Sequence, residues 1–533
     1  MKKASQINPT VAVCIAIAVG VTLAYAIVGA TVRPAMYSDS GWGFLGWDNR
    51  HGLPFNYGAR PDRADFAKDE AAFLGWWSPG QHVLPGVMEM TGLDLGLSIV
   101  AVVTLFSLLG LAGWFVLYRS FGFAATSAAV AVAVIACTRH VSVPFGIYNG
   151  GEVLLFGGAP WFLALLWRLR EFRWTAVLPL VVATAIVTFL KLSGIALAAC
   201  AIGAAAGSAG QWFTRESLRR GVVAGVTIAA IGAAFYFLWA SRGESPAAND
   251  AMQAGGWLVV PRFLLLAAGM IGGGSISFGD LASYVALNPR APLATSLLGL
   301  YLAFLPFAVA IFIFVWWRLR RSHADYLRFT ALLAISVTFV LTVIAARGGA
   351  VEADERHFRI VSLVLFGGIV HSVLGWPDKR IRTGFAAVAL VAAAYGISSF
   401  AARAASSMSR QLGERGFRHL VADKAVLDFI RRVDVAQPDR AATFIYVPSP
   451  EIALEVRNVR RFSNHADFQT VRELEDKMYR GRVPQLYVIV QKRLVAEGKA
   501  AVILQSFADY PADAWQETDL GEFVVFSSDF GAR

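Results

Sequence analysis

The sequence predicts a polytopic α-helical membrane protein of about eleven transmembrane helices, followed by a small α/β domain outside the membrane. Of its 533 residues, 56% are hydrophobic and only 16% are charged, a balance that is abnormal for a soluble protein. Apolar runs recur as far as residue 401, and the composition turns polar from Ser407. We therefore divide the chain into a membrane domain, residues 1–406, and a tail, residues 407–533.

Each predicted span follows from the thickness of a bilayer core, which needs roughly 20 apolar residues per helix. The spans lie near residues 10–32, 96–118, 122–138, 152–167, 176–190, 193–209, 221–240, 294–317, 327–346, 358–375 and 383–401. The first run exceeds the usual length of about 7 to 15 residues in a signal peptide, so we expect it to be retained rather than cleaved. Between the fifth and sixth spans, FLKLSGI fits either a tight turn or a break in one long helix.

Basic residues indicate the orientation of these spans, because Lys and Arg in short loops favour the cytoplasm. Every connection from an even to an odd span is basic, as in WRLREFRW and WWRLRRSH, and Lys2 and Lys3 precede the first span. The N-terminus is therefore expected in the cytoplasm. The first loop (residues 33–95), the segment 241–292 and the tail are expected in the periplasm.

Short β-branched and aromatic runs predict strands in the tail, namely ATFIYV, QLYVIV, AAVIL and GEFVVFS, and segments with helical spacing separate them. Residues 408–533 carry 18 basic and 18 acidic side chains, so the formal net charge of +11 belongs to the membrane domain. That charge fits positive-inside topology and affinity for anionic membrane lipids, and it gives no reason to expect nucleic-acid binding. The three cysteines all fall within predicted spans, which excludes a disulfide framework.

The first loop is far longer than a connector requires. Its segment 62–77 places Phe66, Phe73 and Trp77 on one helical face, which predicts a helix lying in the membrane interface. The Pro-Gly pair that follows would end this helix before the second span. The loop is then either a solvated connection with a tryptophan anchor or a lid over a site that faces the membrane.

This layout resembles the GT-C glycosyltransferases. The shared features are a long external loop that opens with an acidic residue, an interfacial helix, the proline-containing entry WWSPGQHVLPG and the exit LYRSFGF. The resemblance is strongest to enzymes that use polyprenyl-phosphate sugars, including protein mannosyltransferases and the lipid A aminoarabinose transferase. It covers about the first 210 residues, together with the order of membrane domain and external domain. The acidic pair that is often adjacent in that branch is absent, since Asp39 and Asp48 are nine residues apart.

Sugar transfer from a lipid phosphate requires a base for the acceptor hydroxyl and cations or donors for the departing phosphate. Asp39 is our first choice of base because it follows the first span closely, although a turn or a helix flank would also explain it. Asp48 is followed by asparagine and lies close to glycine, which favours a turn. Glu152 begins a predicted span, where the helix dipole favours an anion, and the two glycines before it allow close approach of a ligand.

Three further cationic or polar positions fit phosphate recognition. Lys191 in FLKLSG is flanked by apolar residues and either faces phosphate or extends to the interface. Arg356 and Arg359 in VEADERHFRI offer rigid forks of donors that suit phosphate, although a solvated charged turn explains them equally simply. We assign Asp39 and Glu152 to catalysis. We assign Asp48, His82, Tyr148, Lys191, Arg356, His357 and Arg359 to substrate binding.

The sequence thus predicts an inverting glycosyltransferase of the bacterial inner membrane. It would move a sugar from a polyprenyl-phosphate donor to a lipid, glycan or protein acceptor. A divalent cation such as Mg²⁺ or Mn²⁺ fits between Asp39 and Glu152 if they converge, and a mechanism without metal fits equally well. The alternatives are a transporter or flippase of a lipid-linked glycan, and an assembly protein. Signatures of soluble enzymes are absent, and IGGGS near residue 271 is expected to be a flexible or interfacial loop.

Overall fold

The computed structural model describes residues 8–50, 56–62, 64–75, 78–242, 259–279, 293–347, 354–436, 443–447, 449–463 and 479–529. The chain forms two compact units. The first, which we call the helical unit, comprises Met1–Ile27, Val103–Phe145 and Gly151–Arg403. The second, which we call the mixed unit, comprises Val28–Val102, Gly146–Gly150 and Ala404–Arg533. The first loop and the tail therefore belong to the same unit.

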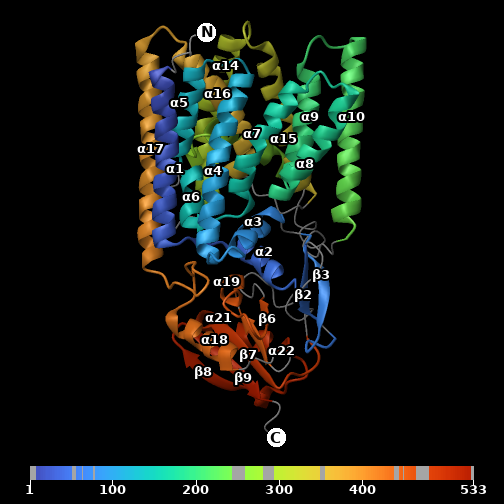
Figure 1. Ribbon diagram of the computed structural model, residues 1–533, viewed down its shortest axis with the longest axis vertical. Helices are drawn as coiled ribbons and strands as arrows, with labels where there is room; N and C mark the ends of the chain where they lie inside the picture. Colours follow the sequence, from blue (N-terminus) through green and yellow to red (C-terminus); the bar gives the residue numbers. More distant parts are fainter. Residues whose placement is uncertain are drawn as a thin grey trace. The chain divides into compact units, whose positions relative to one another are not determined.

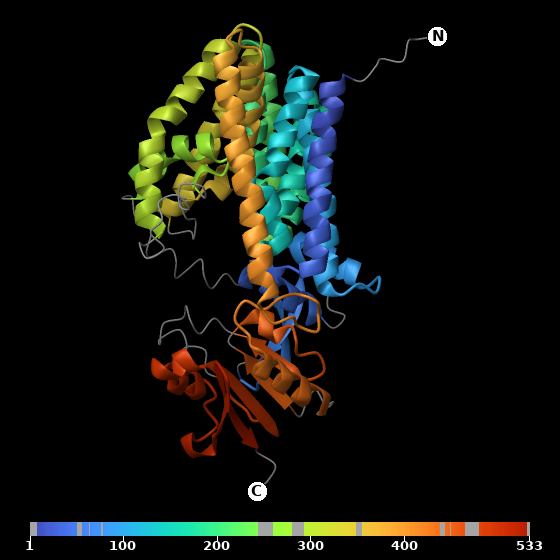
Figure 2. The same cartoon turned by 90° about the vertical axis from the view of Figure 1, so that its left-hand side faces the viewer.

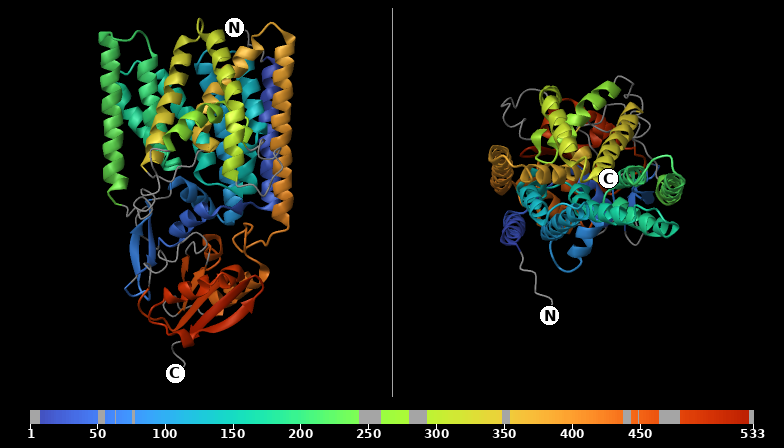
Figure 3. Two further views of the ribbon diagram at one scale, coloured as in Figure 1. Left: turned by 180° about the vertical axis from the view of Figure 1, so that it is seen from behind. Right: turned by 90° about the horizontal axis from the view of Figure 1, so that it is seen from above.

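The helical unit consists of long apolar helices that lie alongside one another (Figures 1 and 3). The helices that lie wholly or largely in it are α1 (Pro9–Val32), α4 (Leu95–Ser120), α5 (Ala125–Cys137), α6 (Arg139–Gly146), α7 (Gly151–Arg168), α8 (Val177–Leu190), α9 (Gly194–Ser208), α10 (Arg215–Phe235), α12 (Val259–Gly273), α14 (Leu293–Leu319), α15 (Ala324–Ala346), α16 (Glu355–Leu374) and α17 (Lys379–Met408). Within the described residues, eight helical segments are long and apolar enough to cross a membrane. All eleven predicted runs are helical, so the prediction of a polytopic helical membrane protein is confirmed.

Two connections between helices differ in how far the sequence predicted them. The break at FLKLSGI separates α8, which ends at Leu190, from α9, which begins at Gly194. The alternative of one long helix there is wrong. The expectation of a loop around IGGGS is wrong for Ile271–Gly273, which end α12 and whose Ile271 is buried in the core of the unit, whereas Gly274 and Ser275 do lie in a turn. An apolar run of only 15 residues is too short to predict a span, yet it packs well inside a bundle.

Helix α16 is buried along most of its length, and two glycines on it permit close packing. A Cβ on Gly367 would lie 2.4 Å from the Tyr118 ring, and one on Gly368 would lie 2.2 Å from the Tyr326 hydroxyl. The Tyr118 hydroxyl donates to the Leu363 carbonyl at 2.6 Å. Small residues that admit bulky partners are typical of helix contacts in membranes. This packing fixes α16, whose first turn carries several of the candidate site residues.

The mixed unit contains a five-stranded sheet in the order β6-β5-β7-β9-β8 (Figure 2). Its strands are β5 (Thr443–Val447), β6 (Arg460–Ser463), β7 (Gln485–Gln491), β8 (Gln516–Leu520) and β9 (Phe523–Asp529). Strands β6, β5 and β7 are parallel, whereas β9 is antiparallel to both β7 and β8. The helices of the tail are α18 (Lys424–Ala436), α19 (Pro450–Ala453), α21 (Lys492–Ala496) and α22 (Lys499–Gln505). The predicted α/β tail is confirmed, except that AAVIL lies in α22 and not in a strand.

The first loop forms a separate set of elements in the same unit. These are β1 (Ala35–Met36), α2 (Ser38–Asp48), β2 (Tyr57–Pro61), β3 (Asp69–Phe73) and α3 (Gly80–Glu89), and β4 (Ile147–Tyr148) pairs in parallel with β1. The predicted interfacial helix over 62–77 is wrong, because β2 and β3 form an antiparallel hairpin there. Phe66 is fully buried among Tyr479, Phe507 and Tyr510 of the tail. Trp77 lies outside the described residues.

Candidate functional site

An ion pair between Glu152 and Lys191 is the centre of a charged group in the helical unit. Glu152 lies in the first turn of α7, and Lys191 caps α8 with an extended backbone. Their side chains are only 16% and 18% exposed. A Cβ on Gly151 would lie 3.1 Å from the Leu190 carbonyl oxygen and from Lys191 Cγ. Glycine at this position therefore allows α7 to begin directly against the turn that carries Lys191.

The first turns of α16 complete this group. Asp354 caps the helix by accepting a hydrogen bond from the Arg356 backbone N–H at 2.9 Å. Arg359 and the His357 ring lie close enough to Glu152 to act on its carboxylate. Arg359 also acts electrostatically on His140 of α6. The structure thus brings together four residues that the sequence analysis singled out separately, Glu152, Lys191, His357 and Arg359, and we call them the cationic cluster.

Two nitrogen atoms in the cationic cluster are buried and have no hydrogen-bond partner among the described residues. They are Nε of Arg359 and Nε2 of His357. A buried polar group without a partner costs about 1–3 kcal/mol, so such groups are rare in folded proteins and call for an explanation. Arg356 differs, because it is exposed and pairs with Asp354 at 3.5 Å. The cluster offers one ammonium, one guanidinium and one imidazole for a ligand that accepts hydrogen bonds.

Glu355 is a buried carboxyl beside this cluster that the sequence analysis did not select. It accepts a hydrogen bond from the Gly279 backbone N–H at 2.8 Å and another from the Tyr301 hydroxyl. Arg359 acts on it as well. The spacing of four residues between Glu355 and Arg359 places both on one helical face. That spacing was visible in VEADERHFRI and could have identified Glu355.

Asp39 lies in the mixed unit, in the first turn of α2, and its side chain is exposed. No described residue forms an ion pair with it. The start of its helix is fixed by β1 and β4, which pair Met36 with Tyr148. The Tyr37 backbone N–H donates to the Tyr148 carbonyl at 3.2 Å, and the Tyr148 hydroxyl donates to the Gln81 carbonyl at 2.6 Å. Tyr148, which we predicted to bind substrate, is fully buried and joins α2 to α3.

His82 is buried in α3 against α2, with an exposed fraction of 2%. A Cβ on Gly43 would lie 2.8 Å from its Nδ1 atom, so glycine is needed for this contact. Burial, followed by the charge of Arg50, lowers the pKa of His82 to about 3. The imidazole is therefore neutral at physiological pH.

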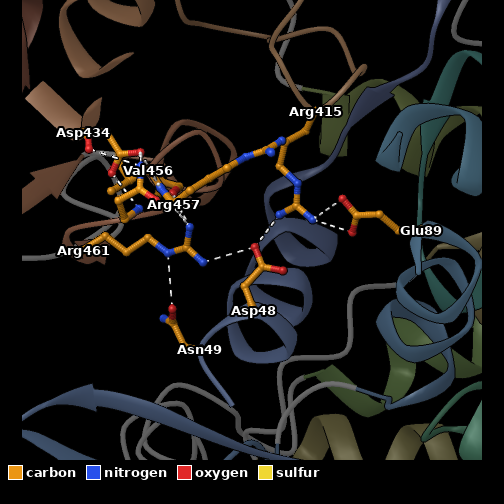
Figure 4. A network of polar contacts seen from close by, with 10 residues as sticks. Asp48, Asn49, Glu89, Arg415, Asp434, Val456, Arg457 and Arg461 are labelled. Carbon is orange, nitrogen blue, oxygen red and sulfur yellow. Dashed lines mark hydrogen bonds and ion pairs between the residues drawn. The ribbon is translucent and has the colours of Figure 1, made fainter. Parts of the chain in front are cut away.

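Asp48 belongs to a network of ion pairs with two arginines of the tail (Figure 4). Arg415 contacts Asp48 and also donates to both carboxylate oxygens of Glu89, at 2.8 and 2.6 Å. Arg461 reaches Asp48 at 3.1 Å and the Asn49 side-chain oxygen at 3.3 Å. Burial alone would lower the pKa of Arg415, but the two carboxylates more than offset it and raise that pKa. Neither arginine was predicted from the sequence.

The described residues contain no group of three His, Cys, Asp or Glu side chains arranged to hold a metal ion. The carboxylate of Glu152 is occupied by Lys191. The divalent cation considered from the sequence therefore stays a prediction.

No known family model matches the sequence, and no curated protein matches it either. The fold of the chain, a bundle of apolar helices with a small α/β domain, is nevertheless similar to that of a solved GT-C protein. The solved structure that shows this is the crystal structure of ArnT from Cupriavidus metallidurans bound to undecaprenyl phosphate. The two chains are 12% identical, the match covers 97% of this chain and 98% of ArnT, and the TM-score is 0.54. The resemblance to GT-C proteins is thus confirmed at the level of the fold.

A further similarity is to the arabinofuranosyltransferase AftD from Mycobacteria. One AftD structure is 14% identical, with a TM-score of 0.46, and the match covers 96% of this chain but 41% of AftD. A second AftD structure has 13% identity, a TM-score of 0.42 and coverage of 89% and 36%.

Proposed function

We propose that this protein is an inverting membrane glycosyltransferase that moves a sugar from a polyprenyl-phosphate donor to an acceptor at the outer face of the inner membrane. The observation that supports this most is the cationic cluster, in which the buried Nε–H donor of Arg359 and the buried Nε2 atom of His357 have no described partner. A phosphate group accepts several hydrogen bonds and suits the planar fork of a guanidinium. ArnT, whose fold this chain shares, was crystallised with undecaprenyl phosphate.

In this reaction an acceptor hydroxyl attacks the anomeric carbon while the bond from that carbon to the phosphate oxygen breaks. The electron pair of the broken bond leaves with the phosphate, and a base takes the proton of the hydroxyl. Lys191 and Arg359 would stabilise the charge that develops on the departing phosphate. Glu152 would keep the Lys191 ammonium in place, as it does by their ion pair.

We propose Asp39 as the base. Its carboxylate is exposed and has no ion-pair partner among the described residues, so a proton acceptor is available at that position. Its location at the start of a helix that is pinned by β1 and β4 limits its movement. General base catalysis contributes about 10²- to 10⁴-fold to a rate.

The test uses purified full-length protein in lipid vesicles with a panel of polyprenyl-phosphate sugars, and it scores transfer to added acceptors or water. We expect the wild type to release sugar from at least one donor, and Asp39→Asn to lower the rate by about 10²- to 10⁴-fold. Asp513→Asn, which alters an exposed aspartate of the tail, is the matched control and should keep full activity.

Two results would contradict the proposal. Full activity of Asp39→Asn would exclude Asp39 as the base while leaving the transferase reading in place. Movement of an intact lipid-linked sugar across the vesicle without cleavage would overturn the transferase reading in favour of a transporter.

A further inference from the structure

We propose that Arg415 is a positioning residue that fixes α2, the helix that carries Asp39, in the orientation needed for sugar transfer. The inference rests on the proposed function, in which Asp39 is the base. Its basis is the network of Figure 4, which links the first loop to the tail inside the mixed unit.

Arg415 contacts the last residue of each of the two helices in the first loop. Asp48 ends α2 and Glu89 ends α3, and the Arg415 side chain between them is only 6% exposed. Figure 4 shows its guanidinium pointing between the two carboxylates. A cation at the carboxyl end of a helix is also favoured by the helix dipole. One side chain thereby joins the ends of α2 and α3.

The base of the Arg415 side chain is itself held in place by neighbouring backbone contacts. The Arg415 carbonyl accepts a hydrogen bond from the Gly96 backbone N–H at 3.1 Å. Three residues later, the Arg418 backbone N–H donates to the Pro34 carbonyl at 2.9 Å, and its side chain donates to the Val32 carbonyl at 3.0 Å. Both ends of the first loop therefore contact the segment that presents the Arg415 guanidinium.

A second contact supports α2 from the tail. Arg461 of β6 reaches Asp48 at 3.1 Å and also donates to the Ala453 carbonyl at 3.2 Å. Near the other end of α2, a Cβ on Gly41 would lie 3.2 Å from Pro450 of α19. The helix thus lies against the tail along its length, with its charged anchor at the end opposite Asp39.

This geometry explains why a distant arginine would affect the base. An 11-residue helix is about 16 Å long, so a tilt of about 4° at one end moves the other end by about 1 Å. A displacement of about 1 Å in a reacting group can lower a rate by about 100-fold. Loss of the Arg415 anchor should therefore lower kcat through Asp39, although Arg415 itself touches no reacting atom.

The experiment compares Arg415→Lys and a double variant, Glu89→Gln with Arg415→Met, in full-length protein in vesicles. The lysine variant keeps the positive charge but lacks the planar guanidinium group. The double variant removes the charges of Arg415 and Glu89 together, while Asp48 keeps its ion pair with Arg461 at 3.1 Å, so no charge of the network is left without a partner. We expect kcat to fall by roughly ten- to hundredfold in both, with KM for the lipid-phosphate donor unchanged within about twofold. Amide hydrogen exchange should increase in residues 38–48.

The matched control is Arg431→Gln, which breaks the exposed pair between Arg431 and Glu414, one residue from Arg415. It should change neither kcat nor exchange. Faster exchange in α2 with wild-type kcat would overturn the positioning role while leaving the proposed transferase intact. Unchanged amide exchange of residues 38–48 in the Arg415 variants would show that Arg415 does not fix α2. If the wild-type protein transfers no sugar, the proposed function itself is overturned.

Discussion

Arg359 of the helical unit and two arginines of the mixed unit, Arg415 and Arg461, differ in how their buried donors are used. In the helical unit, Arg359 keeps a buried Nε without a partner among the described residues, next to an ion pair that the sequence brought to notice. In the mixed unit, Arg415 and Arg461 donate to carboxylates, an amide oxygen and backbone carbonyls. A guanidinium whose hydrogen bonds are satisfied within the protein supports the fold, whereas one with a spare buried donor suits a ligand.

The largest effect that would test this contrast is expected at the ion pair of the helical unit. Glu152→Gln or Lys191→Met alone leaves one mostly buried charge without its partner, which costs about 3–5 kcal/mol in the free energy of unfolding. The double variant should recover most of that loss. Thermal unfolding followed by tryptophan fluorescence in detergent measures the loss of stability in the single variants and its recovery in the double variant. If each single variant lies within about 1 kcal/mol of wild type, the pair does not stabilise the cluster.

A smaller effect is expected at Arg359, measured as ligand affinity. A short-chain polyprenyl phosphate should raise the Tm of the wild type, and Arg359→Gln should weaken its binding by about tenfold or more. The reason is that one hydrogen bond to a charged group contributes about 1.5–3 kcal/mol. Arg461→Gln is the control from the other unit, and it should lower the Tm of the free protein while keeping the phosphate-induced increase. Equal loss of that increase in both variants would remove the distinction between the two arginines.

The remaining test concerns the pH dependence of stability and His82. Its pKa in the folded protein is about 3, below the ordinary value of 6.5, so the unfolded chain binds a proton that the folded chain does not between these values. The free energy of unfolding should therefore fall by about 1.4 kcal/mol per unit as the pH drops from 6.5 towards 3. His82→Gln should show a shallower decline. Unfolding curves of the wild type and of His82→Gln, measured between pH 4.5 and 7, give the slope of the unfolding free energy against pH for each. Equal slopes in the two proteins would contradict the burial of a neutral imidazole at His82.

Much of the helical unit could be predicted from the sequence because span length and charge are local properties. The eleven apolar runs are helices, and Glu152 and Lys191 stood out because ionisable groups are costly among apolar residues. Short runs were less informative. AAVIL has strand-like composition but forms α22, since a run of five apolar residues does not distinguish a buried helix from a strand.

The mixed unit was harder to predict because its contacts join distant parts of the chain. Phe66 shows helical spacing with Phe73, which predicted a helix. Instead, Phe66 is buried among aromatic rings of the tail, and the segment around it forms the β2–β3 hairpin. Arg415 lies in a segment without a motif, and its role follows only from Asp48 and Glu89, which are 367 and 326 residues away. No local pattern could identify such partners.

The same sequence separation has a consequence for biosynthesis. A ribosome adds about 5–20 residues per second, so Asp48 and Glu89 exist for roughly 15 to 75 seconds before Arg415 is made. During that interval Asp48 and Glu89 cannot form their ion pairs with Arg415, although pairs within the first loop such as Arg60 with Glu70 can form. The first loop is thus among the earliest segments synthesised and among the last to mature, and a chain that stops before the tail leaves it permanently unfinished.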